Sequence, residues 1–404
     1  MIPFSPPRID DETIAEVTAA LKSGWITTGP RTKQFEKEIT SYVGCETTVC
    51  VNSWTNGMQV LLHWWGVGEG DEIILPAYTY CASGNVILHS GAKLVMVDID
   101  PEDFNISIQR IKEAMSPNTK VIMPVDIGGF PCDYDAISEI AELGRSNFTP
   151  KNDLQQKLGR PLVVADAAHS FGATYKNVKV GAVADITVFS FHAVKNLSTA
   201  EGGAICFKLP EEFDHDLIYK DFCTKILHGQ SKDALAKTKK GAWKYDVEEP
   251  GFKCNMTDIQ AAIGLVELRR YQSNLDRRKQ IFEKYDATFS RKDWAITPRY
   301  RSETKETSYH LYQLRLEGFT ESMRDELVMA IANKEVAVNV HFQPLPLLTA
   351  YKKRGYEITD FPIAYDHYRN ELSLPVYYDL DDEKVEAVIN AVCESVQEAV
   401  QKDQ

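Results

Sequence analysis

Lys195 is the residue whose place in the sequence most clearly calls for a chemical role. It comes shortly after the apolar run "ITVFSF" (186–191) and before a glycine pair at 202–203, so it stands at the mouth of a predicted buried strand. A lysine is costly to bury unless its amine is paired or used. Two interpretations are open: an exposed surface lysine, or an amine whose pKa is lowered by burial and that forms a Schiff base.

Further polar and aromatic residues stand where neighbouring predicted strands end. Asp166 follows the apolar run "PLVVA", Tyr80 follows "EIILP", and Asp126 follows "VIMPV". In an open α/β sheet, ligands bind beyond the carboxyl ends of the strands. We therefore expect one pocket at this edge. Its other predicted members are Ser53, Trp54, Thr55, Asn56, Tyr78, His169, Ser190 and His192.

The residue types at this edge offer four kinds of contact. Ser53 opens a turn that leads into a helical pattern, where free N–H groups could bind a phosphate, or Ser53 is a simple N-cap. Asp166 either caps the next turn or pairs with a cation, because an unpaired buried carboxylate is unfavourable. Tyr80 either packs in the core or stacks on a flat ring. Together with Lys195, these groups match the needs of pyridoxal phosphate.

Short β-branched runs separated by helical patterns must position these residues. Continuous apolar strands that alternate with helices predict an α/β fold with a mostly parallel sheet, covered on both faces. The predicted strands are "TTVCVNS" (47–53), "EIILPAY" (72–78), "KLVMVDI" (93–99), "KVIMPVDI" (120–127), "PLVVADAA" (161–168) and "ITVFSFH" (186–192).

Beyond residue 256 the pattern changes. Residues 257–289 have apolar positions at helical spacing over about nine turns, which predicts one long helix that links two domains. The following segments predict a smaller α+β domain. We therefore place an N-terminal arm and a large domain at 1–256, and the linking helix and small domain at 257–404. The polar segment 145–161 is predicted to be a surface loop.

The composition excludes several classes of protein. A net charge of −13 argues against nucleic-acid binding, which needs a basic face. No apolar run reaches the roughly 18–20 residues that span a bilayer. The N-terminus shows no signal peptide, so we expect a cytoplasmic protein that does not bind membranes. The eight cysteines have irregular spacing and no CxxC pair, which predicts neither a metal site nor disulfides.

Four segments carry a resemblance to a known family. The chain resembles, over nearly its whole length, the sugar-nucleotide aminotransferases of the DegT/StrS type, a branch of the fold-type I pyridoxal-phosphate enzymes. This resemblance implies a large cofactor-binding domain with a mostly parallel central sheet and a smaller C-terminal α+β domain. The segments are "PAYTYCAS" (76–83), "VVADAAHSFGATY" (163–175), "SFHAVKNLSTAEGG" (190–203) and "GFKCNMTDIQAAIG" (251–264).

The resemblance also implies roles around the cofactor ring. Lys195 would form the Schiff base, and Asp166, the second catalytic residue, would pair with the pyridine nitrogen. His169 would contact the ring or its 3-hydroxyl, and Tyr80 would stack on the ring face.

The phosphate would be held by a second group of residues. Thr55 and Asn56 would bind it through backbone amides, and Ser190 through its hydroxyl. Asn255 resembles an asparagine that reaches the phosphate in the neighbouring subunit. That match implies a homodimer with the active site at the subunit interface.

The implied reaction is transfer of an amino group from glutamate, which leaves as 2-oxoglutarate, to a nucleotide-linked keto-sugar. A 4-keto sugar linked to UDP or dTDP is favoured, and the product would be an amino-sugar nucleotide for polysaccharide or glycan biosynthesis. The alternatives are a dehydratase of the same fold, whose members tend to replace the lysine with histidine, and a non-catalytic regulator. An amino-acid aminotransferase would need an arginine for the second substrate's carboxylate, and Arg299, Arg301 and Arg315 are available.

Two residues depart from the family pattern. Trp54 replaces a small residue at the phosphate turn, and Asp126 stands where a histidine is common, so it receives no family role. His192 and His341 are predicted substrate contacts, and His341 could equally be a hydrogen-bonded structural histidine. The basic segment 232–244 is either a contact for a nucleotide diphosphate or a solvated loop.

Overall fold

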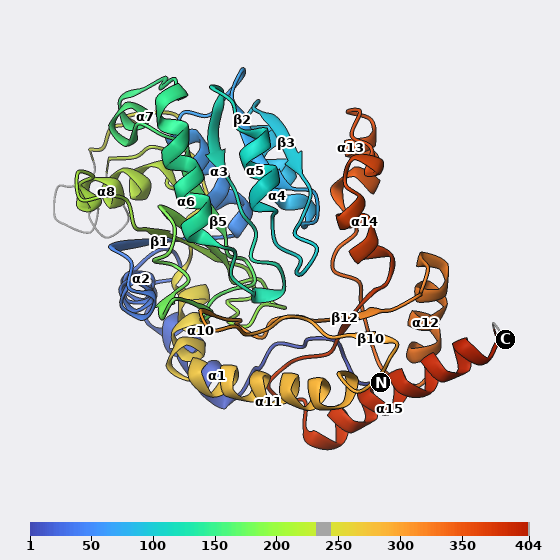
Figure 1. The fold of residues 1–404 in the computed structure, drawn as a ribbon. Coiled ribbons are helices and arrows are strands. Elements are labelled where there is room, and N and C mark those ends of the chain that lie inside the picture. Colours follow the sequence, from blue (N-terminus) through green and yellow to red (C-terminus); the bar gives the residue numbers. More distant parts are fainter. Residues whose placement is uncertain (232–243, 403–404) are drawn as a thin grey trace.

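The computed structural model describes residues 1–231 and 244–402, and a seven-stranded sheet forms its centre (Figure 1). Its strands are β1 (Thr47–Val51), β2 (Glu72–Pro76), β3 (Lys93–Val97), β4 (Thr119–Ile122), β5 (Leu162–Asp166), β8 (Ile186–Ser190) and β9 (Gly203–Phe207). The order is β1-β9-β8-β5-β4-β2-β3, and β9 alone within this sheet runs antiparallel to its neighbours. The mostly parallel α/β fold and its predicted strands are confirmed; β9 was not predicted.

Helices cover both faces of this sheet. Ile73 and Leu75 of β2 share a core with α3 and α4, whereas Ile74 between them packs with α5 and α6 on the opposite face. This alternation follows from the two-residue period of a strand. The helices of this part are α1 (Asp11–Lys22), α2 (Pro30–Val43), α3 (Trp54–Trp64), α4 (Cys81–His89), α5 (Ile108–Ala114), α6 (Tyr134–Leu143), α7 (Asp153–Leu158), α8 (His215–Lys225) and α10 (Asp258–Arg269), with 3-10 turns η1 (Ile127–Gly129) and η2 (Gly144–Asn147).

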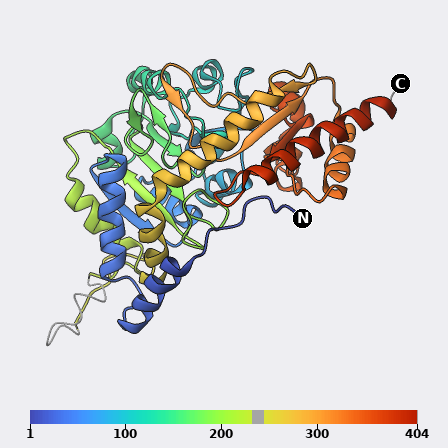
Figure 2. The ribbon, with the colours of Figure 1, turned by 90° about the horizontal axis from the view of Figure 1, so that it is seen from below.

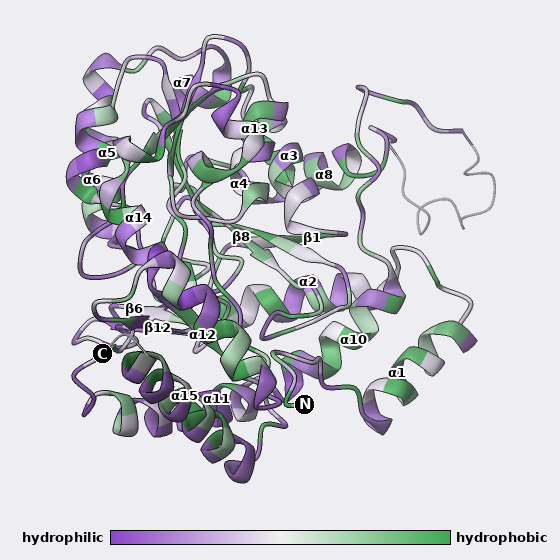
Figure 3. Ribbon diagram, turned by 90° about the vertical axis from the view of Figure 1, so that its right-hand side faces the viewer, coloured by the Kyte–Doolittle hydropathy of each residue, from purple (hydrophilic) through white to green (hydrophobic). Residues whose placement is uncertain are grey.

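A second core lies in the C-terminal part of the chain, where helices pack on an antiparallel sheet. Figure 2 shows α11 running from the large sheet towards this core. There, α15 contacts α11. In Figure 3, the central strands are largely green, which marks hydrophobic residues, whereas α11 and α15 carry both hydrophilic (purple) and hydrophobic (green) residues. The elements are α11 (Tyr271–Phe289), β10 (Ala295–Ile296), β12 (Tyr312–Leu316), α12 (Glu321–Asn333), η3 (Leu345–Leu347), α13 (Thr349–Lys352), η4 (Ile358–Asp360), α14 (Pro362–Arg369), β13 (Glu371–Leu374) and α15 (Asp382–Lys402). A third, small sheet joins β6 (Thr174–Tyr175), β7 (Val178–Lys179) and β11 (Lys305–Glu306).

The two predicted domains share contacts that the sequence did not reveal. Leu345, Tyr351 and Tyr368, all beyond residue 256, belong to the core of the large sheet. The Tyr351 hydroxyl donates to the Cys81 carbonyl at the start of α4 (3.0 Å). The boundary between residues 256 and 257 stays a prediction.

The prediction of one long helix over 257–289 was wrong. The backbone leaves the helical region at Arg270 (φ −102°, ψ 7°), so α10 ends there and α11 begins at Tyr271. Tertiary contacts hold the break: the Arg270 guanidinium binds Glu267 and Asp10, and the buried Tyr271 hydroxyl donates to the Phe171 carbonyl. Apolar spacing alone could not reveal these contacts.

The prediction of a surface loop over 145–161 was also wrong in part. Residues Asp153–Leu158 form the short helix α7. Asn152 caps it by accepting the Gln155 N–H (2.9 Å), and Gly159 ends it with a positive φ of 68°. An Asn N-cap and a C-terminal glycine are helix signals that the polar composition obscured.

None of the helices among residues 1–231 and 244–402 is long and apolar enough to cross a membrane. The cytoplasmic location stays a prediction. All eight cysteines are free thiols.

Candidate active site

A cavity of about 360 Å³ opens at the carboxyl ends of β5 and β8. Its position fits the rule that ligands bind at this edge of an α/β sheet. The cavity brings together most of the residues singled out from the sequence, from segments far apart in the chain. These are Ser53, Trp54, Thr55, Tyr80, Asp166, His169, Ser190, His192, Lys195 and His341.

Lys195 lies on the turn that follows β8, where its N–H donates to the His192 carbonyl (2.8 Å). Burial lowers the pKa of its amine to about 8, and the negative charge of Asp166 opposes this shift. A surface lysine would keep its ordinary pKa near 10.4. The shift increases the fraction of neutral, nucleophilic amine near physiological pH, as Schiff-base chemistry needs.

Asp166 is the last residue of β5 and is only 3% exposed. Its Oδ2 accepts the Ser83 hydroxyl (2.7 Å), and its Oδ1 accepts the Ala168 N–H (3.3 Å). Burial raises its pKa to about 6, although these hydrogen bonds and Lys195 act in the opposite direction. Among the described residues, the carboxylate therefore has two hydrogen-bond donors but no ion-pair partner.

His169 is buried between two other rings. Phe342 stacks on it (centroids 5.6 Å apart, 22° between planes), and His310 lies 4.5 Å away. Burial and the nearby Lys195 keep its pKa well below the ordinary value, so the ring is neutral. The Gly128 N–H points to Nδ1 (3.3 Å), so Nδ1 accepts and Nε2 carries the proton. Nε2 is thus the donor available to a bound molecule.

The predicted phosphate end lies at the start of α3. Ser53 caps this helix, and Thr55 and Ser190 line the cavity beside it. Gly203 lets the backbones approach: a Cβ there would lie 2.8 Å from the Trp54 N and the Phe189 O. That close approach explains the glycine that follows the lysine segment.

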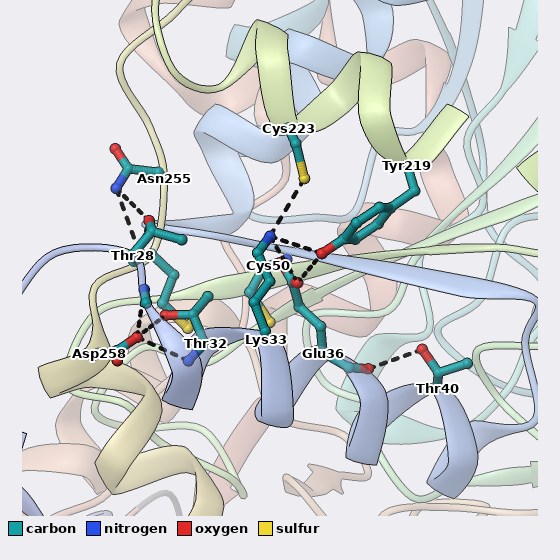
Figure 4. Close-up of polar contacts among 12 residues, drawn as sticks. Thr28, Thr32, Lys33, Glu36, Thr40, Cys50, Tyr219, Cys223, Asn255 and Asp258 are labelled. Atoms are coloured by element: carbon teal, nitrogen blue, oxygen red, sulfur yellow. Dashed lines mark hydrogen bonds and ion pairs between the residues drawn. The ribbon is translucent and has the colours of Figure 1, made fainter. Parts of the chain in front are cut away.

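Two predicted phosphate contacts, Asn56 and Asn255, do not line this cavity. The Asn56 N–H donates to the Ser53 Oγ (3.1 Å), which is the N-cap arrangement that the sequence left open. Asn255 lies in the segment before α10, where its Nδ2 donates to the Thr28 Oγ1 (2.6 Å; Figure 4). Both roles stay predictions, and a role for Asn255 requires a second subunit.

Tyr80 and His192 are the exposed members of the set. Tyr80 precedes α4 and is 58% exposed, with its ring 5.6 Å from that of Phe342. His192 lies 3.6 Å from the Glu201 carboxylate. Neither residue is core, so the interpretation of Tyr80 as a packing residue is wrong.

His341 enters the cavity from the C-terminal part of the chain. Its carbonyl accepts the Tyr78 hydroxyl and the Gln313 amide (both 2.7 Å). Its N–H donates to the buried Glu371 carboxylate (2.8 Å), whose pKa burial raises to about 8. Burial and Lys195 lower the pKa of the His341 ring to about 3, so it is neutral.

Several other residues that the sequence singled out do not line the cavity. Asp126 is fully buried and accepts the Cys132 N–H, the Tyr134 hydroxyl and the Ser170 hydroxyl, so it holds the loop after β4. Arg299, Arg301 and Arg315 do not line the cavity; Arg299 and Arg315 line another one, of about 340 Å³. The basic segment 232–244 lies, apart from Lys244, outside the described residues.

The cavity also has lining residues that the sequence did not single out, among them Phe4, Ser83, His310 and Phe342. Ser83 stands two residues inside α4, and His310 precedes β12. Phe342 directly follows the predicted His341, which was a usable signal. Nothing in the local sequence of Phe4 pointed to the cavity, because only the fold carries the N-terminus there.

The residues present fit pyridoxal phosphate. Asp166 is a buried carboxylate without a bound cation, which a protonated ring nitrogen would supply. Lys195 provides an amine of lowered pKa in the same cavity, and the start of α3 with Ser190 provides an anion site. Among the described residues, no group of three or more His, Cys, Asp and Glu side chains could hold a metal ion.

These features define a pyridoxal-phosphate-dependent enzyme of fold type I. The sequence pattern of the DegT/DnrJ/EryC1/StrS aminotransferase family matches residues 7–393, and the chain belongs to this family. The spore coat polysaccharide biosynthesis protein SpsC of Bacillus subtilis (strain 168) is 38% identical over 405 residues, which covers 98% of both chains.

Solved structures agree with this assignment. The putative sugar aminotransferase Spr1654 from Streptococcus pneumoniae, in its PMP-form, is 45% identical with a TM-score of 0.96, over 99% of this chain and 100% of that one. Its PLP-form is 43% identical with a TM-score of 0.94, over 98% and 99%. The aminotransferase TlmJ from Streptoalloteichus hindustanus is 30% identical with a TM-score of 0.85, over 99% and 100%. The protein is thus a pyridoxal-phosphate-dependent sugar aminotransferase.

Proposed function

We propose that the protein transfers the amino group of glutamate to a nucleotide-linked keto-sugar, and that the sugar is a 4-keto sugar linked to UDP or dTDP. The product would be an amino-sugar nucleotide for polysaccharide or glycan biosynthesis. The observation that carries the proposal is that one cavity contains both residues. The Lys195 amine there has a lowered pKa, and the Asp166 carboxylate has no ion-pair partner among the described residues.

When bound, pyridoxal phosphate supplies a carbonyl that forms an imine with an amine and a ring that stabilises negative charge on the adjacent carbon. Asp166 would hold the proton on the ring nitrogen and so keep the ring electron-withdrawing. Lys195, once its Nζ is displaced by the amino donor, would take a proton from the substrate carbon and return it elsewhere, as a general base and acid. His169 would donate from Nε2 to the ring oxygen.

Because Lys195 is present, the proposal favours transamination over the dehydratase, whose lysine is replaced. The relative SpsC is named for spore coat polysaccharide biosynthesis, and Spr1654 is titled a putative sugar aminotransferase. Both names support a sugar acceptor. Glutamate, the nucleotide and the 4-keto position rest on the family resemblance.

We also propose a homodimer whose subunits complete each other's active sites, with Asn255 of one subunit near the other's cofactor phosphate. Apolar side chains support an interface around α1, since Ile14, Leu21 and Ile26 are all more than half exposed. Sedimentation or light scattering should give twice the monomer mass. A monomer that is fully active would refute this part.

The decisive experiment follows the visible absorption band of the purified holoprotein. Glutamate should bleach the band, and one of the UDP-, dTDP- or GDP-linked 4-keto sugars should restore it. The sugar that does so names the nucleotide. Lys195→Ala is the matched variant that should fail to complete the cycle.

The other outcomes point elsewhere. If glutamate leaves the band unchanged while another amino acid bleaches it, the donor is wrong. If no amino donor bleaches it and a hydroxyl is lost from the sugar, the dehydratase is correct. If a plain 2-oxo acid restores the band and none of the sugars does, the protein is an amino-acid aminotransferase.

A further inference from the structure

The first five residues form a strap across the active-site cavity. The Ile2 N–H donates to the Glu335 carbonyl (2.7 Å) and the Ala337 N–H donates to the Ile2 carbonyl (3.0 Å), so Ile2 pairs with the segment after α12. The Ser5 hydroxyl donates to the carbonyl of Val194, the residue before Lys195 (3.3 Å). Figure 2 shows this segment extending from α1 to the C-terminal part of the chain.

Between these two attachments, Phe4 turns its ring to the cavity. It lines the cavity together with Ser5 and stacks on His341 (centroids 5.3 Å apart, 30° between planes). Phe342 continues the aromatic surface, since its ring lies 5.0 Å from His341 and 5.6 Å from His169. One wall of the cavity is therefore a row of neutral rings.

We propose that Phe4 is a specificity-determining residue that contacts the sugar ring of the acceptor. This inference rests on the proposed function. Aromatic faces provide large apolar contact at low conformational cost, and the apolar face of a deoxy sugar is complementary to them. The Ser5 contact to Val194 keeps Phe4 close to the lysine, where the reacting sugar carbon must lie.

The amino donor makes a different demand on the same cavity. Glutamate is small and carries three charged groups, so a neutral aromatic wall offers it little. Phe4 should therefore act in the sugar half of the reaction and leave the glutamate half unchanged. A purely structural role for the strap would affect both halves.

The test compares the two half-reactions in the wild-type holoenzyme and in Phe4→Ala. The rate at which glutamate bleaches the cofactor band measures the first half. The KM for the UDP- or dTDP-linked 4-keto-6-deoxyhexose that restores the band measures the second. We expect Phe4→Ala to raise the KM for the sugar about 10- to 100-fold, the range for losing a hydrophobic contact, with the glutamate half within about twofold.

Three further variants make the result interpretable. Phe4→Tyr keeps the aromatic face and should retain nearly wild-type KM, whereas Phe4→Leu keeps bulk only and should lie between. Leu217→Ala removes an exposed apolar side chain of α8, far from the cavity lining, and should change neither half. Thermal unfolding of each variant checks that the fold is intact.

Equal changes in both halves, or an unchanged KM for the sugar in a folded Phe4→Ala protein, would overturn the role of Phe4 alone. If the wild-type enzyme is bleached by glutamate but restored by none of the sugars, the proposed function fails. The assignment of Phe4 to the sugar then fails with it.

Discussion

Asp166 and Asp258 are both buried aspartates, but their carboxylates differ in the number of hydrogen bonds that they accept. Asp258 accepts four hydrogen bonds, from the N–H groups of Gly29, Arg31 and Thr32 and from the Thr32 hydroxyl (2.7–3.1 Å; Figure 4). It thereby caps α2, whose own N-cap residue Gly29 has no side chain to do so. The Asp166 carboxylate accepts two hydrogen bonds and has no ion-pair partner in the part of the chain that the structure describes.

The same contrast separates two lysines. Lys33 on α2 lies 3.3 Å from Glu36 and donates to the Tyr219 hydroxyl (2.7 Å; Figure 4). Although burial opposes its charge, Glu36 holds its pKa above the ordinary value. Burial instead lowers the pKa of Lys195 to about 8. Around α2, Lys33 has an ion-pair partner and Asp258 has four donors, whereas the cavity holds a buried carboxylate with two donors and an amine of lowered pKa.

Unsatisfied buried charge is unfavourable for folding and is retained where a ligand or a reaction uses it. The comparison therefore separates a structural cluster from a functional one without reference to any relative. Four measurements test the contrast between the two regions.

Lys195→Ala should lower kcat by about 10⁴-fold, because both the Schiff base and the proton transfer depend on this amine. Lys33→Met is the matched control, since it removes a satisfied lysine and should leave kcat within about tenfold. Steady-state assays with glutamate and the keto-sugar measure both. Comparable losses of kcat in the two variants would show that Lys195 is no more important for the reaction than Lys33.

Asp166→Asn should lower kcat by about 10²- to 10³-fold, the usual effect of removing one preorganised electrostatic contact. An amide cannot hold the proton on the ring nitrogen as a carboxylate does. The absorption band of the bound cofactor should also change in the variant. A kcat near that of wild type would contradict the pairing with the ring.

The two aspartates should have opposite effects on the stability of the apoprotein. Because the pKa of Asp166 is about 6 in the folded chain and near 3.9 when unfolded, its ionisation destabilises the fold increasingly as pH rises from about 4 to 6. Asp166→Asn should raise the free energy of unfolding by about 2–3 kcal/mol at pH 7 and by nothing below about pH 4.

Asp258→Asn should instead lower that free energy at pH 7 by about 1–3 kcal/mol, because the amide keeps one acceptor oxygen and turns a donor towards the Arg31 N–H. Urea unfolding at several pH values measures both variants. If Asp258→Asn instead raised the free energy of unfolding, the hydrogen bonds to this carboxylate would not stabilise the fold.

Ser83→Ala should have the smallest effect. Its hydroxyl bonds to the ionised Asp166, so removing it should raise the pKa of that carboxyl further, by about one pH unit. The pH range over which ionisation of Asp166 destabilises the apoprotein should therefore move to higher pH by the same amount. Ser116→Ala, which removes a hydroxyl bonded to Glu72 elsewhere, should leave the Asp166 pKa unchanged.

Much of the fold and site was predictable because the relevant signals are local. β-branched runs gave the parallel strands, and their ends gave Asp166 and Lys195. Where tertiary contacts compete with the local pattern, prediction failed. The break at Arg270 depends on Asp10 at the other end of the chain, and β9 pairs with two strands in an antiparallel sense that its sequence does not encode.

Residue types at the predicted strand ends indicated the cofactor from the sequence, because parallel strands all end at one edge of a sheet, and the resemblance in four segments gave the class of protein. Only the tertiary structure decided which distant residues complete the site. Phe4 and His310 reach the cavity from segments in which no cofactor contact was predicted. No local pattern records such neighbours, because their approach depends on how the segments pack and not on the residues beside them.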